Sequence, residues 1–252
     1  METLKTKIRA ELTAYKDLLR AVPGSVTAAF VVGCVLMNLF ANKSLDFGIS
    51  WLVADGGLVL SWAAFLTNDI VVKRFGAKAS VRMTVFGLFC NLVVAGIFAI
   101  IGNFPGWWGE YFTYELEEVN TALNTTMAGT WYILLGSSVA FLVSGIANAF
   151  INAGLKKLFK NHDSFFEYSF RSYVSTFLAQ FIDNMVFSMI VSMNFFGWTW
   201  GQAIIAAALG GFLELMMEVF FSPIGFVLVK KWKKENVGEE YLKKYAPEML
   251  EE

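Results

Sequence analysis

Six long apolar segments constrain this chain more than any other feature of its sequence. They cover residues 25–41, 47–66, 85–101, 130–155, 173–196 and 203–229. A helix needs about 20 apolar residues to cross the roughly 30 Å hydrocarbon core of a bilayer. The segments lack the alternation of polar and apolar residues that outer-membrane barrels show. The sequence therefore predicts an all-α integral membrane protein with six transmembrane helices.

The composition excludes several other classes of protein. Hydrophobic residues make up 56% of the 252 residues and charged residues only 16%, whereas soluble domains average about 25% charged residues. The net charge of -1 provides no field that would attract nucleic acid. His162 is the single histidine, and Cys34 and Cys90 both lie in apolar runs. We therefore expect no disulfide scaffold, no metal site, no cofactor and no nucleic-acid partner.

The basic residues predict the orientation of the chain in the membrane. All but one of the 20 lysines and arginines lie before the first span, after the last, or between spans two and three or four and five. The exception is Lys43, between spans one and two. Because basic residues accumulate in cytoplasmic segments, six spans place both termini in the cytoplasm. The implied location is the cytoplasmic (inner or plasma) membrane of a prokaryote, as a multi-pass protein.

The two ends of the chain differ from its middle. We divide the chain into an amphipathic N-terminal segment (1–22), a six-helix transmembrane domain (23–230) and a charged cytoplasmic tail (231–252). The N-terminal segment is expected to form a helix on the cytoplasmic membrane surface. A helix that docks a partner protein is the open alternative. Its apolar residues at helical spacing are Leu4, Ile8, Leu12, Tyr15 and Leu19.

The loop over residues 102–126 combines aromatic and acidic residues and contains no lysine or arginine. Such aromatic residues are typical of a belt at the level of the lipid headgroups. The alternative is a short helix that covers the outer mouth of a cavity.

Polar residues in the middle of the fifth segment predict a functional site. Gln180, Asp183 and Asn184 lie three and four residues apart, a spacing that places them on one helical face, and Thr176 extends that face by one turn. A charge at the bilayer centre costs about 2.5–3.5 kcal/mol on the lenient insertion scale. This face should therefore point into the helix bundle. Hydrogen bonds that only hold helices together are the alternative interpretation.

Other spans contribute further candidates. Glu214 and Glu218 lie four residues apart in the sixth span, Asn148 lies in the fourth, and Asp69 ends the second. Asp55 precedes two glycines, which suggests a local helix break within the second span. Acids and amides near the midplane favour a cavity that binds a small polar molecule.

Three motifs carry a resemblance to a known family. They are TNDIVVKRFGAKA (67–79), RSYVSTFLAQFIDNMVF (171–187) and LELMMEVFFSPIGF (213–226). In this order they resemble the signature of the queuosine precursor transporter family, also called the vitamin uptake transporter (VUT) family. Where the family often has Asp in span four and Lys in span six, this chain has Asn148 and Glu214. Counterparts of the family's second motif are Arg171, Ser175, Thr176, Gln180 and Asp183.

The resemblance implies import of a 7-deazaguanine base such as preQ0, preQ1 or queuine, with proton coupling as one open mode of energisation. Asp183 is expected to accept the paired donors of a guanine-like edge, and Gln180 and Asn184 to bond the rest of the base. Glu214 or Glu218 would pair with an aminomethyl cation or carry a proton. The candidates for stacking on the base are Phe187, Trp131 and Trp62. The full set of expected substrate-binding residues is Asp183, Gln180, Asn184, Arg171, Thr176, Asp69, Glu214, Glu218 and Asn148.

Alternatives to a solitary carrier remain open. A substrate-binding S-component of an energy-coupling-factor vitamin transporter has a similar size and layout, and the basic loops 73–82 and 156–171 would dock its coupling subunit. A homo-oligomer is a further possible assembly. An intramembrane enzyme that uses Glu214 and Glu218 is a weaker alternative, because a carboxylate pair without a surrounding motif is not specific. We therefore expect a transporter and not an enzyme.

Overall fold

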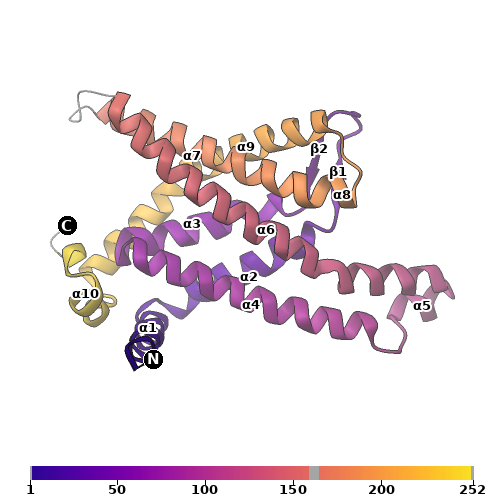
Figure 1. Ribbon diagram of the computed structural model, residues 1–252, viewed down its shortest axis with the longest axis horizontal. Coiled ribbons are helices and arrows are strands. Elements are labelled where there is room, and N and C mark those ends of the chain that lie inside the picture. The colour runs from indigo at the N-terminus through magenta and orange to yellow at the C-terminus, as the bar shows by residue number, and fades with distance from the viewer. Residues whose placement is uncertain (1, 159–164, 251–252) are drawn as a thin grey trace. The chain divides into compact units, whose positions relative to one another are not determined.

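The computed structural model describes residues 2–158 and 165–250, and helices dominate this part of the chain (Figure 1). The chain forms two compact units. The first comprises residues 1–35, 60–90 and 218–252, and the second comprises residues 36–59 and 91–217. Helices α2 (Gly24–Phe40), α4 (Ala77–Asn103) and α9 (Trp200–Lys234) each contribute residues to both units.

Long apolar helices confirm the predicted all-α membrane protein. Four stretches of the described chain are long and apolar enough to cross a membrane: α4, Glu117–Ser144 of α6 (Glu117–Leu158), Thr176–Phe195 and α9. Thr176–Phe195 starts within α7 (Phe165–Phe187) and continues through the π-helix η1 (Ser188–Ser192) and α8 (Met193–Phe195). A fifth crossing is added if α2 is counted with α1 (Glu2–Ala21). The count of six spans, the cytoplasmic termini and the three-part division of the chain stay predictions.

The helix predicted over residues 47–66 is wrong in its first half. Strands β1 (Ser44–Asp46) and β2 (Val53–Asp55) form an antiparallel hairpin there, and helix α3 (Leu58–Phe75) begins only after Gly56 and Gly57. The backbone N–H of Gly48, whose φ is 76°, donates to the Asp46 carboxylate at 2.8 Å. Such a turn suits glycine and interrupts a helix. The apolar run is therefore not one continuous span.

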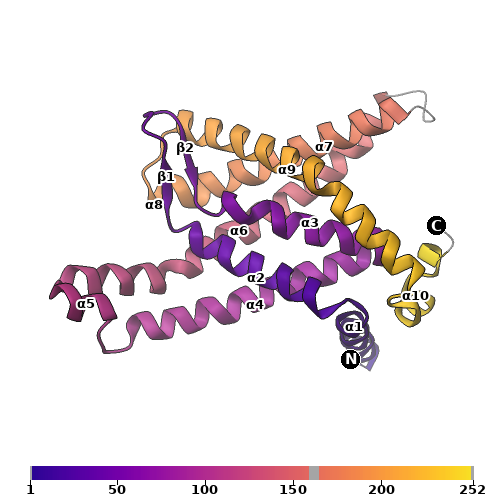
Figure 2. The ribbon, with the colours of Figure 1, turned by 180° about the vertical axis from the view of Figure 1, so that it is seen from behind.

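The first unit is held by an apolar and aromatic core at one end of its helices. Phe75, Trp232 and Tyr241 pack together, with the Phe75 ring 6.1 Å from Trp232 and 6.0 Å from Tyr241. The buried Arg74 side chain donates to the Val237 carbonyl at 3.1 and 2.8 Å. These contacts hold α10 (Glu239–Tyr245), which follows the end of α9 (Figure 2), and the last turn η2 (Pro247–Leu250).

The second unit is built around the antiparallel pair α6 and α7, which lie side by side in both ribbon views (Figures 1 and 2). Ile133 and Ala140 of α6 pack against Phe187 and Val191 in one core cluster. Trp198, two residues before α9, packs against Val53 of the hairpin and donates from Nε1 to Ser44 Oγ at 3.2 Å. The hairpin is therefore attached to the beginning of α9.

The predicted loop over residues 102–126 contains a short helix, in line with the second of its two interpretations. Helix α5 (Gly109–Tyr114) precedes α6, and the Trp108 indole donates to Asn124 Oδ1 at 2.7 Å. The Trp108 backbone N–H donates to Asn120 Oδ1 at 2.9 Å. These bonds fix the loop to the first turns of α6. Its position over the mouth of a cavity stays a prediction.

Candidate functional site

Helices α6, α7 and α9 bring five polar residues together inside the second unit. We call Ser144, Gln180, Asp183, Asn184 and Glu214 the polar cluster. Ser144, Gln180 and Glu214 are at most 8% exposed, even with no bilayer around the chain. Each therefore needs partners within the protein or from a bound molecule.

Asp183 points toward α6. Ser144 donates from Oγ to Asp183 Oδ1 at 2.7 Å, a short bond typical of a hydroxyl and a carboxylate. Among the described residues, no lysine or arginine forms an ion pair with Asp183. A carboxylate has about four acceptor positions. This single bond therefore leaves most of the acceptor capacity of Asp183 open.

Asn184 faces α9, unlike its neighbour Asp183. Its Nδ2 donates to Glu214 Oε2 at 3.2 Å and to the Gln180 backbone carbonyl at 3.0 Å. An amide nitrogen has two hydrogens, so both donors are in use and Oδ1 remains an acceptor. The side chains of α7 that were predicted to share one helical face therefore contact two different helices, α6 and α9.

Glycine at position 210 makes room for the Asn184 amide. A Cβ atom at Gly210 would lie 3.0–3.2 Å from the amide atoms of Asn184, and one at Gly211 would lie 3.1 Å from the backbone nitrogen of Phe181. Small residues allow membrane helices to approach closely. The two glycines therefore set the distance between α7 and α9 at the level of the cluster.

Gln180 carries a polar atom that the fold leaves unsatisfied. Its side chain is 7% exposed, and Oε1 is buried without a hydrogen-bond partner among the described residues. A buried acceptor without a partner costs about 1–3 kcal/mol. Such groups are rare in folded proteins and need an explanation. A bound molecule that donates to Oε1 would remove this cost.

The polar face of α7 continues into a π-helix, which the sequence reasoning missed. Gln180, Asn184, Ser188 and Ser192 follow at intervals of four residues, and Ser192 Oγ is also buried without a partner in the described part of the chain. π-helices are often found at functional sites. The Tyr132 hydroxyl and the Asn194 amide both donate to the Ile190 carbonyl at 2.7 Å. These two side chains stabilise the widened turn.

Ser144 is also absent from the residues that the sequence predicts for the site. Its partner Asp183 is predicted, but a serine in an apolar helix has no distinctive signal of its own. The available clue was its position four residues before the candidate Asn148. Residues four apart lie on the same side of a helix, so the spacing from Asn148 would have added Ser144 to the predicted substrate-binding residues.

The remaining predicted residues lie elsewhere or outside the described part of the chain. Asp69, in the first unit, forms an ion pair with Lys73 at 3.3 Å, and both side chains are more than a third exposed. Thr176 is half-buried on α7. Asp55 ends β2 and accepts from the Gly57 backbone N–H at 2.8 Å, so it shapes the turn before α3. Among the predicted substrate-binding residues, the structure does not describe the side chains of Asn148, Arg171 and Glu218.

The three aromatic residues expected to stack on a base have other environments. Phe187 is buried in the core between α6 and α7. Trp62 belongs to the first unit, where it stacks on Phe221 with ring centroids 4.3 Å apart. Trp131 is 54% exposed. The expectation that these rings form a stacking platform therefore gains no support from their positions.

Comparison with known proteins identifies a family. The family described as "Putative vitamin uptake transporter" matches residues 55–228. This range includes the whole polar cluster and excludes α1, α2 and α10. No curated protein and no solved structure was found to match the chain. The described residues contain no group of three histidine, cysteine or acidic side chains that could hold a metal ion.

Proposed function

Because the chain belongs to the vitamin uptake transporter family, we propose that it imports a queuosine precursor across the cytoplasmic membrane of a prokaryote. The coarser statement, a vitamin-type uptake transporter with several membrane-crossing helices, follows from the family and from the apolar helices. The finer statement, a 7-deazaguanine base such as preQ0, preQ1 or queuine, is supported by the chemistry of the polar cluster.

The observation that carries this proposal is the set of open acceptors on α7. Asp183 uses one bond to Ser144, Asn184 keeps Oδ1, and Gln180 Oε1 is buried without a partner among the described residues. A guanine-like edge offers a ring N–H beside an exocyclic amine, two parallel donors that one carboxylate accepts well. The remaining donors of the base would reach the amide oxygens. A base that left these buried acceptors unpaired would be rejected strongly.

Glu214 has the second role in the proposal. It is 5% exposed and accepts from Asn184. A change in its protonation or ligand contacts would therefore change the hydrogen bonding of the Asn184 amide that is proposed to bind the base. Glu214 would pair with the aminomethyl cation of a charged precursor. Alternatively, Glu214 or Glu218 would carry a proton that is coupled to transport.

The direct test is equilibrium binding to the purified full chain. The ligands are queuine, preQ1 and preQ0, with guanine and biotin for comparison. We expect saturable binding of one deazaguanine, and at least a tenfold loss in Asp183→Asn, because hydrogen bonds to charged groups contribute about 1.5–3 kcal/mol. Glu118→Gln is the matched control, since Glu118 is an exposed acid in the first turn of α6.

Two outcomes would contradict the proposal. Full affinity in Asp183→Asn would exclude Asp183 as the residue that accepts the base. Absence of binding by all three deazaguanines, with a protein that unfolds cooperatively, would exclude the substrate class. The transporter family would then stand with a different substrate.

The S-component alternative makes a separate prediction. It requires a coupling subunit, so proteoliposomes that contain only this chain would bind the base without accumulating it. The basic loop expected over residues 73–82 is wrong, because this segment forms the end of α3 and the start of α4 with only Gly76 between them. Within the first unit, Arg74 bonds the Val237 carbonyl and Arg82 pairs with Glu11. These contacts occupy two of the four basic side chains of the segment, which favours the solitary carrier. An intramembrane enzyme would alter the bound base, a change that mass spectrometry of the released ligand would detect.

A further inference from the structure

Helix α1 has two apolar faces, and only one of them is covered. Ala14 and Leu18 are 1% and 0% exposed, and Leu18 belongs to the core of the first unit. Leu4, Ile8 and Leu12, by contrast, are 63%, 51% and 63% exposed. Because they are four residues apart, they form a ridge along the helix. An exposed ridge of large apolar side chains marks an interaction surface.

Basic residues flank this ridge on one side. With 3.6 residues per turn, the exposed Lys5, Arg9, Lys16 and Arg20 project on a single flank next to the ridge. The exposed surface of α1 is therefore positive on the side opposite the core, and the apolar ridge lies between this basic flank and the buried side.

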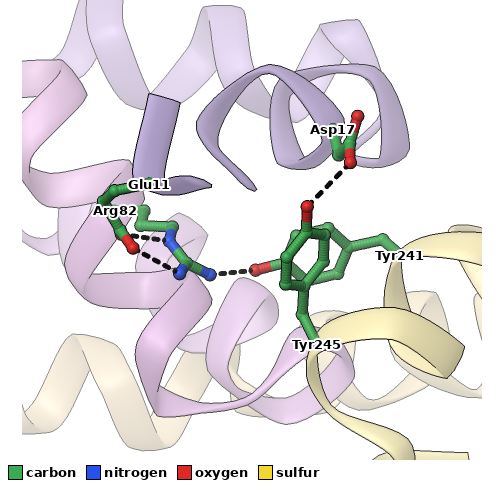
Figure 3. Close-up of polar contacts among 5 residues, drawn as sticks. All are labelled: Glu11, Asp17, Arg82, Tyr241 and Tyr245. Carbon is green, nitrogen blue, oxygen red and sulfur yellow. Dashed lines mark hydrogen bonds and ion pairs between the residues drawn. The ribbon is translucent and has the colours of Figure 1, made fainter. Parts of the chain in front are cut away.

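Glu11 and Asp17 of α1 do not cancel this charge, because they are paired with other helices. Glu11 accepts from Arg82 Nε at 2.7 Å, and Asp17 accepts from the Tyr245 hydroxyl at 2.9 Å (Figure 3). Asp17 also accepts from Lys244 Nζ at 2.9 Å. Arg82 also donates to the Tyr241 hydroxyl at 2.7 Å. These bonds fix the rotation of α1 about its axis. The ridge and the basic flank are therefore held outward.

The direction of α1 suits a flat surface. It meets α2 at 108°, close to a right angle. Helix α2 is mostly apolar and has no charged residue, with the sequence GSVTAAFVVGCVLMNLF. If α2 runs along the membrane normal, α1 runs nearly parallel to the membrane plane.

We propose that α1 lies on an anionic phospholipid surface, with its ridge at the boundary of headgroups and acyl chains and its basic flank among the headgroups. Interfacial helices of this kind combine buried apolar area with attraction to anionic lipids. A membrane accommodates both the ridge and the positive flank. The inference is independent of the transported molecule, since α1 lies outside the residues that match the family.

The test places a nitroxide on each side of α1 in the full-length chain. Cys34 and Cys90 are replaced by alanine, and Ile8→Cys on the ridge is compared with Thr13→Cys on the exposed opposite side. The protein is reconstituted in vesicles of phosphatidylglycerol and phosphatidylcholine, or of phosphatidylcholine alone. Collision of the nitroxide with oxygen shows that it lies in lipid, and collision with a water-soluble nickel chelate shows that it is exposed to water. We expect Ile8→Cys in anionic vesicles to favour oxygen several-fold over Thr13→Cys.

Charge variants identify the lipid as the partner. Lys5→Gln and Lys16→Gln should each lower the ratio of lipid-docked to water-exposed α1 in anionic vesicles by about fivefold. Lys231→Gln, a basic residue of α9 that is 65% exposed, serves as the control. Equal nickel access at positions 8 and 13 would overturn the proposal. Protection of position 8 from both reagents would also overturn it, because a protein surface would then cover the ridge.

Discussion

The polar cluster and the contacts that hold α1 differ in how many of their polar and charged groups have a hydrogen-bond or ion-pair partner. Around α1, Glu11 faces Arg82 and Asp17 faces Lys244, so each of these acids has a cation. In the polar cluster, Asp183 accepts from a serine hydroxyl and forms no ion pair with a lysine or arginine of the described residues. Two atoms along the polar face of α7 and η1 have no partner among the described residues, Gln180 Oε1 and Ser192 Oγ.

This difference separates a structural contact from the proposed binding site. Paired charges and buried rings around α1 leave little capacity for a ligand, so their role is to hold helices together. Open acceptors in an apolar bundle are expensive unless something binds them. The family match includes the polar cluster but excludes α1 and α10, which agrees with this division. The following predictions test it, beginning with the largest expected effect.

Gly210→Val should weaken substrate binding about tenfold to hundredfold, the range expected from 1–3 kcal/mol of overpacking. A Cβ at this position already lies 3.0 Å from Asn184 Nδ2, so valine would push the amide away from Glu214. Gly129→Val in α6 is the matched control, because nothing lies within 4 Å of a Cβ there. The measurement is the affinity for the deazaguanine that binds the parent chain. An equal loss in both variants would contradict the assigned role of Gly210.

Arg82→Gln should leave substrate affinity unchanged and lower the free energy of unfolding by about 1–2 kcal/mol, because it removes hydrogen bonds to Glu11 and Tyr241. The Glu11 side chain is 56% exposed. Solvent therefore screens its charge, and the loss in free energy of unfolding is at the lower end of the range for hydrogen bonds between charged groups. Thermal unfolding in detergent measures it, with Lys231→Gln as the control. A loss of binding without a loss of stability would show that the two regions are not separate in function.

Acid should weaken the contacts that hold α1, and it should lower the free energy of unfolding by less than Arg82→Gln does. The hydrogen bond from Arg82 lowers the pKa of Glu11, and Lys244 followed by Tyr245 lowers the pKa of Asp17. A carboxyl group with a lowered pKa stabilises the folded state above its unfolded pKa of about 4. This contribution is lost as the pH falls through the lowered pKa.

The stability difference between the parent chain and Glu11→Gln should therefore be present at pH 7 and disappear below about pH 4. Melting temperatures at several pH values test this, and Glu118→Gln provides a baseline for an exposed acid in another helix. A difference that grows on acidification would have the wrong sign for a carboxylate stabilised by Arg82.

Much of the helical architecture and part of the candidate site followed from local sequence. Apolar runs predicted the regions of α4, α6, α7 and α9, because hydrophobicity over about 20 residues is a property of the segment itself. The position of Asp183 within such a run is enough to mark its charge as costly. The hairpin at residues 44–55 was not predicted, because its apolar residues have the composition of a membrane span. The positive φ of Gly48, which interrupts the helix, cannot be inferred from composition.

Residue spacing placed Gln180, Asp183 and Asn184 correctly along one helix, but spacing does not say which helix lies opposite. Adjacent residues on a helix point about 100° apart, so once α6 and α9 pack on either side, Asp183 meets Ser144 and Asn184 meets Glu214. The π-turn that follows depends on Tyr132 and Asn194, which approach Ile190 only in the packed bundle.

The sequence by itself determined that this chain is a helical membrane protein with acids and amides buried in its spans, because burial cost and helical period are local properties. Only the tertiary structure decided which of those groups are satisfied and which remain open. The partners of Asp183, Asn184 and Glu11 lie 39, 30 and 71 residues away in the chain. Contacts over such separations depend on how helices pack, and the pattern within any single segment does not contain that information.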